Sequence, residues 1–112
     1  MQRKKNLAAL AFLIIATAFA THAKASTKYS LKFTFSGEES SNDDMKKYIL
    51  GCLPNKTWID EFPGKPTEKW KITVPAVNKI EWNTIQVKDR LMSTGCDKAR
   101  PKAVSKVSVN KV

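Results

Sequence analysis

The segment Ser40–Pro54, SSNDDMKKYILGCLP, decides the fold that the sequence predicts. Its apolar residues recur at i, i+3, i+4, i+7 and i+8, which places them on one face of an α-helix; they are Met45, Tyr48, Ile49, Cys52 and Leu53. Polar residues before Met45 suit the amino end of a helix, where they cap it and oppose its dipole, and Pro54 ends it. The sequence therefore predicts an amphipathic helix whose apolar face covers the rest of the domain.

The chain has two cysteines, and one of them lies on the apolar face of this helix. A small exported domain can bury only a limited core, and disulfides commonly compensate for that. We therefore expect a single disulfide between Cys52 and Cys96, which pins the helix to the domain.

The amino-terminal segment has the pattern of a secretory signal peptide. Three basic residues open it, the run Leu7–Ala20 is apolar or small, and residues 23–25 (Ala-Lys-Ala) fit the A-x-A cleavage pattern. We place cleavage after Ala25, with Ala20 or Ala23 as alternatives. The apolar run falls short of the ~20 residues that a membrane-spanning helix needs. No integral membrane span is thus expected in the mature chain.

The predicted mature chain, Ser26–Val112, is one small domain in the periplasm or outside the cell. Its net charge is +6 instead of the +10 of the whole sequence, because four basic residues precede Ser26 and all ten acidic residues follow it. This charge favours an acidic partner, either another envelope or extracellular protein or an anionic polymer. Lysines also keep small secreted proteins soluble, which is the simpler reason for such a charge.

Alternation of apolar and polar residues is typical of β-strands, and five segments show it; they are residues 29–35, 57–62, 69–74, 80–87 and 103–109. The segment 80–87 changes parity in its middle, and we expect an extra residue near Asn83 to form a β-bulge. The polar segment 88–100 fits either a short helix or a loop. The predicted fold class is α+β, with one amphipathic helix packed on a small, mainly antiparallel sheet and one disulfide.

The residue types of the mature chain argue against an enzyme. The one histidine, His22, belongs to the predicted signal peptide, so no imidazole remains for nucleophilic catalysis or a histidine zinc site. Two cysteines are too few for an all-cysteine zinc site. We expect no catalytic site, no metal and no cofactor. A hydrolase that uses the adjacent carboxylates Asp60 and Glu61, and a calcium site in the acidic segment 38–44, are the alternatives.

Lysines and one tryptophan are the candidate binding residues. Four lysines alternate with apolar neighbours, which predicts that they share the open face of the sheet; they are Lys32, Lys69, Lys71 and Lys79. Among the tryptophans, we expect Trp70 and Trp82 in the core and Trp58 at the surface. We therefore predict a non-catalytic binding protein that acts by protein–protein contact, as an inhibitor or accessory subunit. Binding of an anionic envelope polymer or polysaccharide is the alternative, and a small hydrolase is the third.

Overall fold

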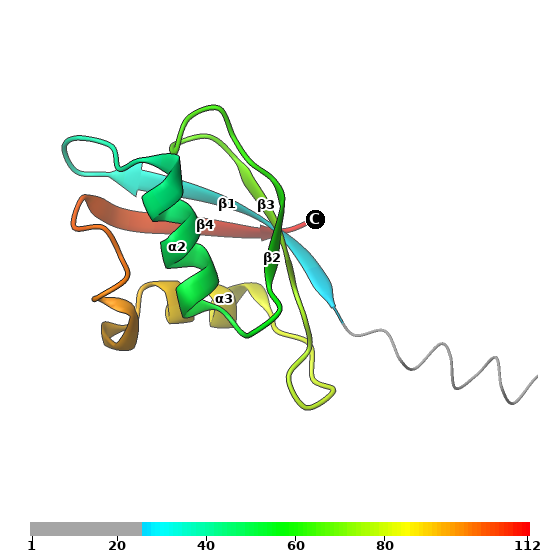
Figure 1. Cartoon of the computed structure of the whole chain (residues 1–112). Helices are drawn as coiled ribbons and strands as arrows, with labels where there is room; N and C mark the ends of the chain where they lie inside the picture. The colour runs from blue at the N-terminus through cyan, green and yellow to red at the C-terminus, as the bar shows by residue number, and fades with distance from the viewer. Residues whose placement is uncertain (1–25) are drawn as a thin grey trace, which may run out of the picture.

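A computed structural model describes residues 26–112, and the predicted signal peptide lies outside these residues. The strands are β1 (Thr27–Phe35), β2 (Trp58–Glu61), β3 (Trp70–Val74) and β4 (Val104–Lys111), and the helices are α2 (Asn42–Cys52), α3 (Thr84–Leu91) and the short 3₁₀ helix η1 (Thr94–Cys96). The four strands form one antiparallel sheet in the order β2-β3-β1-β4. The helices pack against one face of this sheet (Figure 1). The predicted α+β class is confirmed.

The central strand β1 fixes the register of the sheet. It pairs with β3 on one side, where Ser30 lies opposite Lys71, and with β4 on the other, where Lys32 lies opposite Ser108. The first and last strands of the described chain therefore lie side by side. The strands β2 and β4 form the two edges.

The core lies between the sheet and the helices. The side chain of Ser41 caps α2 by accepting a hydrogen bond from the backbone N–H of Asp44, at 3.1 Å. The inward residues of α2 are buried as predicted, and they meet the inward residues of the strands; the largest of these are Tyr29, Leu31, Phe33, Met45, Tyr48, Ile49, Trp70 and Ile72. Burying this apolar surface stabilises the fold by roughly 25 cal/mol per Å² removed from water.

The predicted disulfide is present and joins Cys52, at the end of α2, to Cys96 in η1. The two residues are 44 positions apart in sequence, and their Cα atoms are 5.7 Å apart. Both are buried, with exposed fractions of 2% and 8%. The bridge therefore ties the helix to the segment that leads back into β4.

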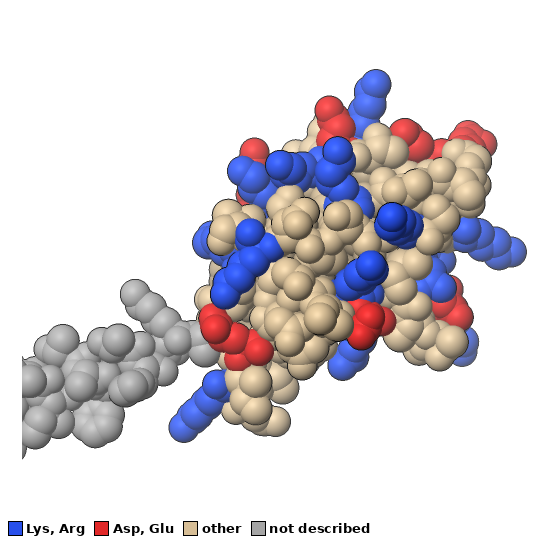
Figure 2. All heavy atoms as spheres, turned by 180° about the vertical axis from the view of Figure 1, so that it is seen from behind, with Lys and Arg blue, Asp and Glu red and all other residues tan. Residues whose placement is uncertain are grey.

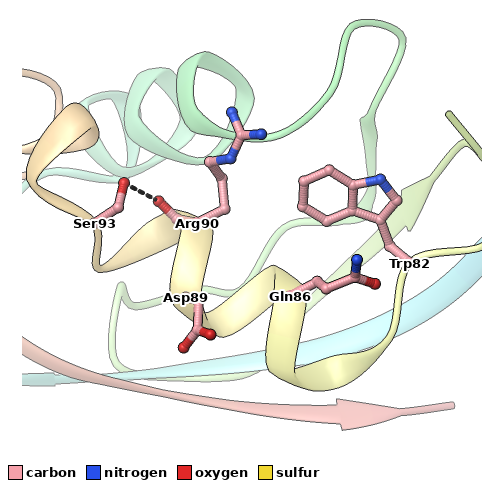
Figure 3. Close-up of a pocket in the computed structure, with 5 residues that line it drawn as sticks. All are labelled: Trp82, Gln86, Asp89, Arg90 and Ser93. Atoms are coloured by element: carbon pink, nitrogen blue, oxygen red, sulfur yellow. Dashed lines mark hydrogen bonds between the residues drawn. The ribbon is translucent and has the colours of Figure 1, made fainter.

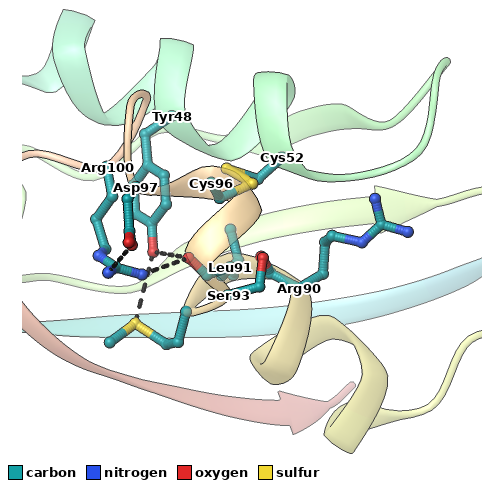
Figure 4. Close-up of polar contacts among 9 residues, drawn as sticks. Tyr48, Cys52, Arg90, Leu91, Ser93, Cys96, Asp97 and Arg100 are labelled. Carbon is teal, nitrogen blue, oxygen red and sulfur yellow. Dashed lines mark hydrogen bonds and ion pairs between the residues drawn. A yellow bond between two sulfur atoms is a disulfide. The ribbon is translucent and has the colours of Figure 1, made fainter.

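A group of hydrogen bonds lies beside the disulfide and also joins α2 to the segment before β4 (Figure 4). The hydroxyl of Tyr48 donates a hydrogen bond to the backbone carbonyl of Leu91, at 3.0 Å, and Arg100 Nη1 donates to the same carbonyl at 3.2 Å. One oxygen atom thus connects α2, the end of α3 and the segment before β4. Burial raises the pKa of Tyr48 to about 12, against the opposing effect of the Arg100 charge.

The predicted strand over residues 80–87 is wrong. Asn78 and Lys79 are the corners of a tight turn, with φ of 54° and 65°, and backbone hydrogen bonds between Val77 and Ile80 close it. The helix α3 then begins after Asn83. The parity change that suggested a bulge marks the start of α3, where side chains follow a period of 3.6 residues.

A capping box explains why the helix starts there. The side chain of Asn83 accepts from the backbone N–H of Gln86, and the side chain of Gln86 accepts from the backbone N–H of Asn83. These reciprocal bonds satisfy two donors that the first turn would otherwise leave unpaired. Val87 and Leu91, four residues apart, then point into the core. The segment 88–100 accordingly contains the end of α3 and η1.

Candidate functional site

The face of the sheet opposite the helices is uncovered and polar, and we call it the open face. Its side chains alternate along the strands with those of the core, because successive residues of a strand point to opposite faces. Between its charged residues lie short hydroxyl and amide side chains, which are Ser30, Thr34, Thr73, Ser108 and Asn110. Seen from behind the view of Figure 1, the molecule shows more Lys and Arg than Asp and Glu (Figure 2).

Four lysines cross the open face in a stepwise row, the lysine row: Lys28, Lys71, Lys32 and Lys106, in that order. Lys71 lies opposite Ser30, which places it diagonally between Lys28 and Lys32 of β1. Lys106 lies opposite Thr34, which places it diagonally next to Lys32. Diagonal neighbours on adjacent antiparallel strands lie about 7–8 Å apart. The row therefore runs without a gap over β3, β1 and β4.

The β2 edge of the open face holds an aromatic side chain in a hydrogen-bonded position. Asp60 accepts hydrogen bonds from Trp58 Nε1, at 2.7 Å, and from Thr73 Oγ1, at 2.5 Å. Its Oδ1 atom also lies 3.8 Å from Lys28 Nζ. Partial desolvation opposes the ionisation of Asp60, but these hydrogen bonds and the lysine charge outweigh it and lower the pKa below its usual value. Trp58 is 50% exposed and is thus presented to solvent in a fixed orientation.

The charge of the open face is unevenly distributed. On its β2 side, Lys28 pairs with Asp60, and Lys71 Nζ lies 3.3 Å from a carboxylate oxygen of Glu61. Within residues 26–112, Lys32 and Lys106 make no ion pair. The half of the face formed by β1 and β4 is therefore the part with uncompensated positive charge.

The predicted site residues are only partly brought together. Lys32 and Lys71 lie on the open face, and Trp58 lies at its edge. Lys69 precedes β3 and is exposed, but it belongs to the loop before the strand. Lys79 occupies the tight turn after β3, since the strand predicted to carry it does not exist. Neither of these two lysines is part of the lysine row.

Sequence reasoning missed the other two members of the row, Lys28 and Lys106. The signal was present in both cases, since Lys28 has the parity of Lys32 in the first strand and Lys106 alternates with Val107 in the last. The register between β1 and β4 was needed to show that Lys106 is the neighbour of Lys32.

A separate hollow lies along α3, around the tryptophan that we expected in the core. Trp82 packs against the core but remains partly exposed, and the guanidinium of Arg90 stacks over its ring, 5.3 Å from the centroid. Two adjoining hollows, of about 390 and 480 Å³, share these two residues. We call them together the Trp82–Arg90 groove, and Figure 3 shows the residues that line the smaller hollow.

The two carboxylates named for the hydrolase alternative both have partners on the open face. Asp60 accepts hydrogen bonds from Trp58 and Thr73, and the adjacent Glu61 is paired with Lys71. In the part of the chain that the structure describes, His, Cys, Asp and Glu side chains nowhere gather in threes to hold a metal ion.

Two further observations bear on the setting of this site. Among the described helices, none is long and apolar enough to cross a membrane. Comparisons with protein-family models, with curated proteins and with solved structures found no match. The chemistry of the open face and the groove is therefore the basis for a functional proposal.

Proposed function

We propose that this chain is a small exported, non-catalytic binding protein that contacts an acidic partner protein through the lysine row and Trp58. The observation that carries the proposal is the sheet face opposite the helices, on which four lysines form a continuous row. Lys32 and Lys106 are diagonal neighbours without an ion pair in residues 26–112, and an acidic partner would relieve the repulsion between them.

Export is supported by two features of the chain. The amino-terminal residues have the pattern of a signal peptide, and the described domain contains a disulfide. Both suit the periplasm or the extracellular space, where disulfides persist. The proposed partner is accordingly another envelope or extracellular protein.

The position of Trp58 favours a protein as the partner. Aromatic residues are enriched in protein interfaces, where they supply contact area at a small cost in conformational entropy. The hydrogen bond from Trp58 Nε1 to Asp60 already restricts the ring before any partner binds. Trp58 lies opposite Thr73 of β3, and Thr73 lies opposite Lys28 of β1, so the ring is next to the lysine row and both can contact one partner.

A second candidate function is the binding of an anionic polymer of the envelope, and the even stepping of the lysine row favours it. Lysines about 7–8 Å apart on a flat surface can contact successive anionic groups of an extended chain. The uncompensated charges of Lys32 and Lys106 would contribute most to such binding. Its affinity would fall steeply with salt, because bound lysines release counterions from the polymer.

The test is affinity capture from an envelope extract with the purified exported protein as bait, followed by mass spectrometry. We expect the wild type to capture an acidic protein and the variant Lys32→Glu/Lys106→Glu to lose it. The matched control is Lys47→Glu/Lys88→Glu, which changes the net charge equally on exposed positions of α2 and α3.

The control should retain the captured protein. Equal capture by both double variants would refute the role of the lysine row. Capture of a polymer without protein would instead favour the second candidate function.

A further inference from the structure

Two hydrogen-bonded turns form part of the wall of the larger hollow in the Trp82–Arg90 groove. The turn 54–57 is closed by a bond from the N–H of Thr57 to the carbonyl of Pro54, at 3.1 Å, and the turn 77–80 by a reciprocal pair at 3.1 and 3.0 Å. Both turns contribute to the larger hollow of the groove. Its shape is therefore set by backbone hydrogen bonds and is present before any ligand arrives.

The larger hollow combines apolar walls with amide groups. Pro54, Ala76, Val77 and the ring of Trp82 supply the apolar surface, and the side chains of Asn55 and Asn78 supply hydrogen-bonding groups. Val77 and Ile80 are 40% and 66% exposed, so the apolar surface continues over the turn. A few polar groups in an apolar hollow are the usual composition of a ligand site.

The charge at this hollow is positive and uncompensated. Arg90 makes no ion pair within residues 26–112, and the larger hollow is lined by no carboxylate. Asp89 lines the smaller hollow, and its carboxylate points away from the guanidinium of Arg90 (Figure 3). The guanidinium of Arg90 lies over the Trp82 ring, 5.3 Å from its centroid, and a guanidinium in this position can bind a carboxylate with two parallel hydrogen bonds.

We propose that the larger hollow binds the carboxyl terminus of a partner polypeptide that ends in an apolar residue. Arg90 binds the terminal carboxylate, Trp82 contacts the terminal side chain, and the amides of Asn55 and Asn78 bind the preceding peptide group. The cation and the ring lie only 5.3 Å apart, and a carboxyl-terminal residue carries its carboxylate and its side chain on the same Cα. This surface is distinct from the lysine row, and its occupant is defined by one negative charge next to one apolar group.

The test is an NMR titration of the ¹⁵N-labelled exported protein with the peptide N-acetyl-Gly-Gly-Leu. We expect saturable shifts of the Trp82 indole N–H and of the Asn55 and Asn78 side-chain amides. The same peptide with a carboxyl-terminal amide should bind at least tenfold more weakly. Equal binding of the acid and the amide, or an indole resonance that does not shift, would overturn the proposal.

Two variants locate the site. Arg90→Gln should weaken binding of the acid at least tenfold, because it removes the charge and keeps a side chain of similar shape. The control Lys88→Gln changes the same charge on the same helix, outside the groove, and should bind like the wild type. The double variant of Lys32 and Lys106 should also bind the peptide normally, which separates this site from the open face. Unchanged affinity in a folded Arg90→Gln protein would refute the role of Arg90.

Discussion

The two faces of the sheet are built by the same strands but follow different rules. The covered face is apolar, and burial under α2 and α3 fixes nearly every side chain on it. The open face is held by hydrogen bonds and charges at its β2 edge and leaves Lys32 and Lys106 without ionic partners. Because strand residues alternate between faces, one stretch of sequence specifies both. Stability should therefore reside mainly on the covered face and binding on the open one.

The largest expected effect comes from a charge placed on the covered face. Ile49 is fully buried under α2, so Ile49→Asp should lower the free energy of unfolding by about 4 kcal/mol or more and leave the protein unfolded or nearly so. Lys47→Asp, on the exposed side of the same helix, should change it by no more than about 0.5 kcal/mol. Thermal melts of both variants measure this. Similar losses in the two would contradict the assignment of the helix faces.

Removal of the disulfide should have the next largest effect. The double variant Cys52→Ala/Cys96→Ala should lose about 2–4 kcal/mol, because the bridge restricts the unfolded chain over a long loop. Denaturant titrations give the loss. Thiol titration of the denatured, unreduced wild type should find no free thiol, and two reactive thiols per chain would contradict the bridge.

The buried tyrosine predicts a loss of stability in alkali. The pKa of Tyr48 is raised to about 12 in the folded chain, so the folded state holds a proton that the unfolded state loses near pH 10. This raised pKa contributes about 2–3 kcal/mol to the free energy of unfolding below pH 10, and the contribution is lost as the pH rises toward 12. Denaturant unfolding of wild type and Tyr48→Phe at several pH values measures this. The difference between the two proteins should shrink through this range, and a constant difference would argue against Tyr48 as the cause.

A smaller effect is expected at the edge of the open face. Asp60→Asn keeps the shape of the side chain but weakens the acceptor for Trp58 and Thr73, which should cost about 1 kcal/mol at pH 7. The folded pKa of Asp60 is lowered, so its contribution is present above pH ~4 and is lost as pH falls through the folded value. Melts of both proteins at neutral and acidic pH should show the difference vanish in acid. If Asp60→Asn lowered the free energy of unfolding more than removal of the disulfide does, the claim that stability resides mainly on the covered face would be contradicted.

The covered face could be predicted from the sequence because its buried residues are apolar and recur with the period of a helix or a strand. The apolar spacing of α2 and the alternation around Leu31 and Ile72 each indicated their element and its inward side. The segment from Ile80 to Val87 misled because Ile80 lies in a turn, Trp82 lies in a loop, and only the residues from Thr84 onward belong to α3. The decisive signal there was local and polar, in the pair Asn83 and Gln86 that caps α3.

The candidate sites were less predictable because they depend on register and on tertiary placement. Nothing in the order of residues shows that Lys106 lies beside Lys32, which follows from the pairing of β1 with β4. Trp82 has the parity of a core residue, but it lies in the loop before α3 and stays partly exposed. The groove beside it requires two turns that are far apart in sequence.

The central claim is that the open face binds an acidic partner through the lysine row without contributing much to stability. Its most direct test is the association rate with the captured partner, measured from about 50 to 200 mM salt for the wild type and for Lys32→Glu/Lys106→Glu. The wild-type rate should fall steeply with salt, because screening acts over about 8–10 Å near physiological ionic strength. The variant should associate slowly at low salt, show little salt dependence and melt at nearly the wild-type temperature. Equal rates with equal salt dependence in the two proteins would contradict the account.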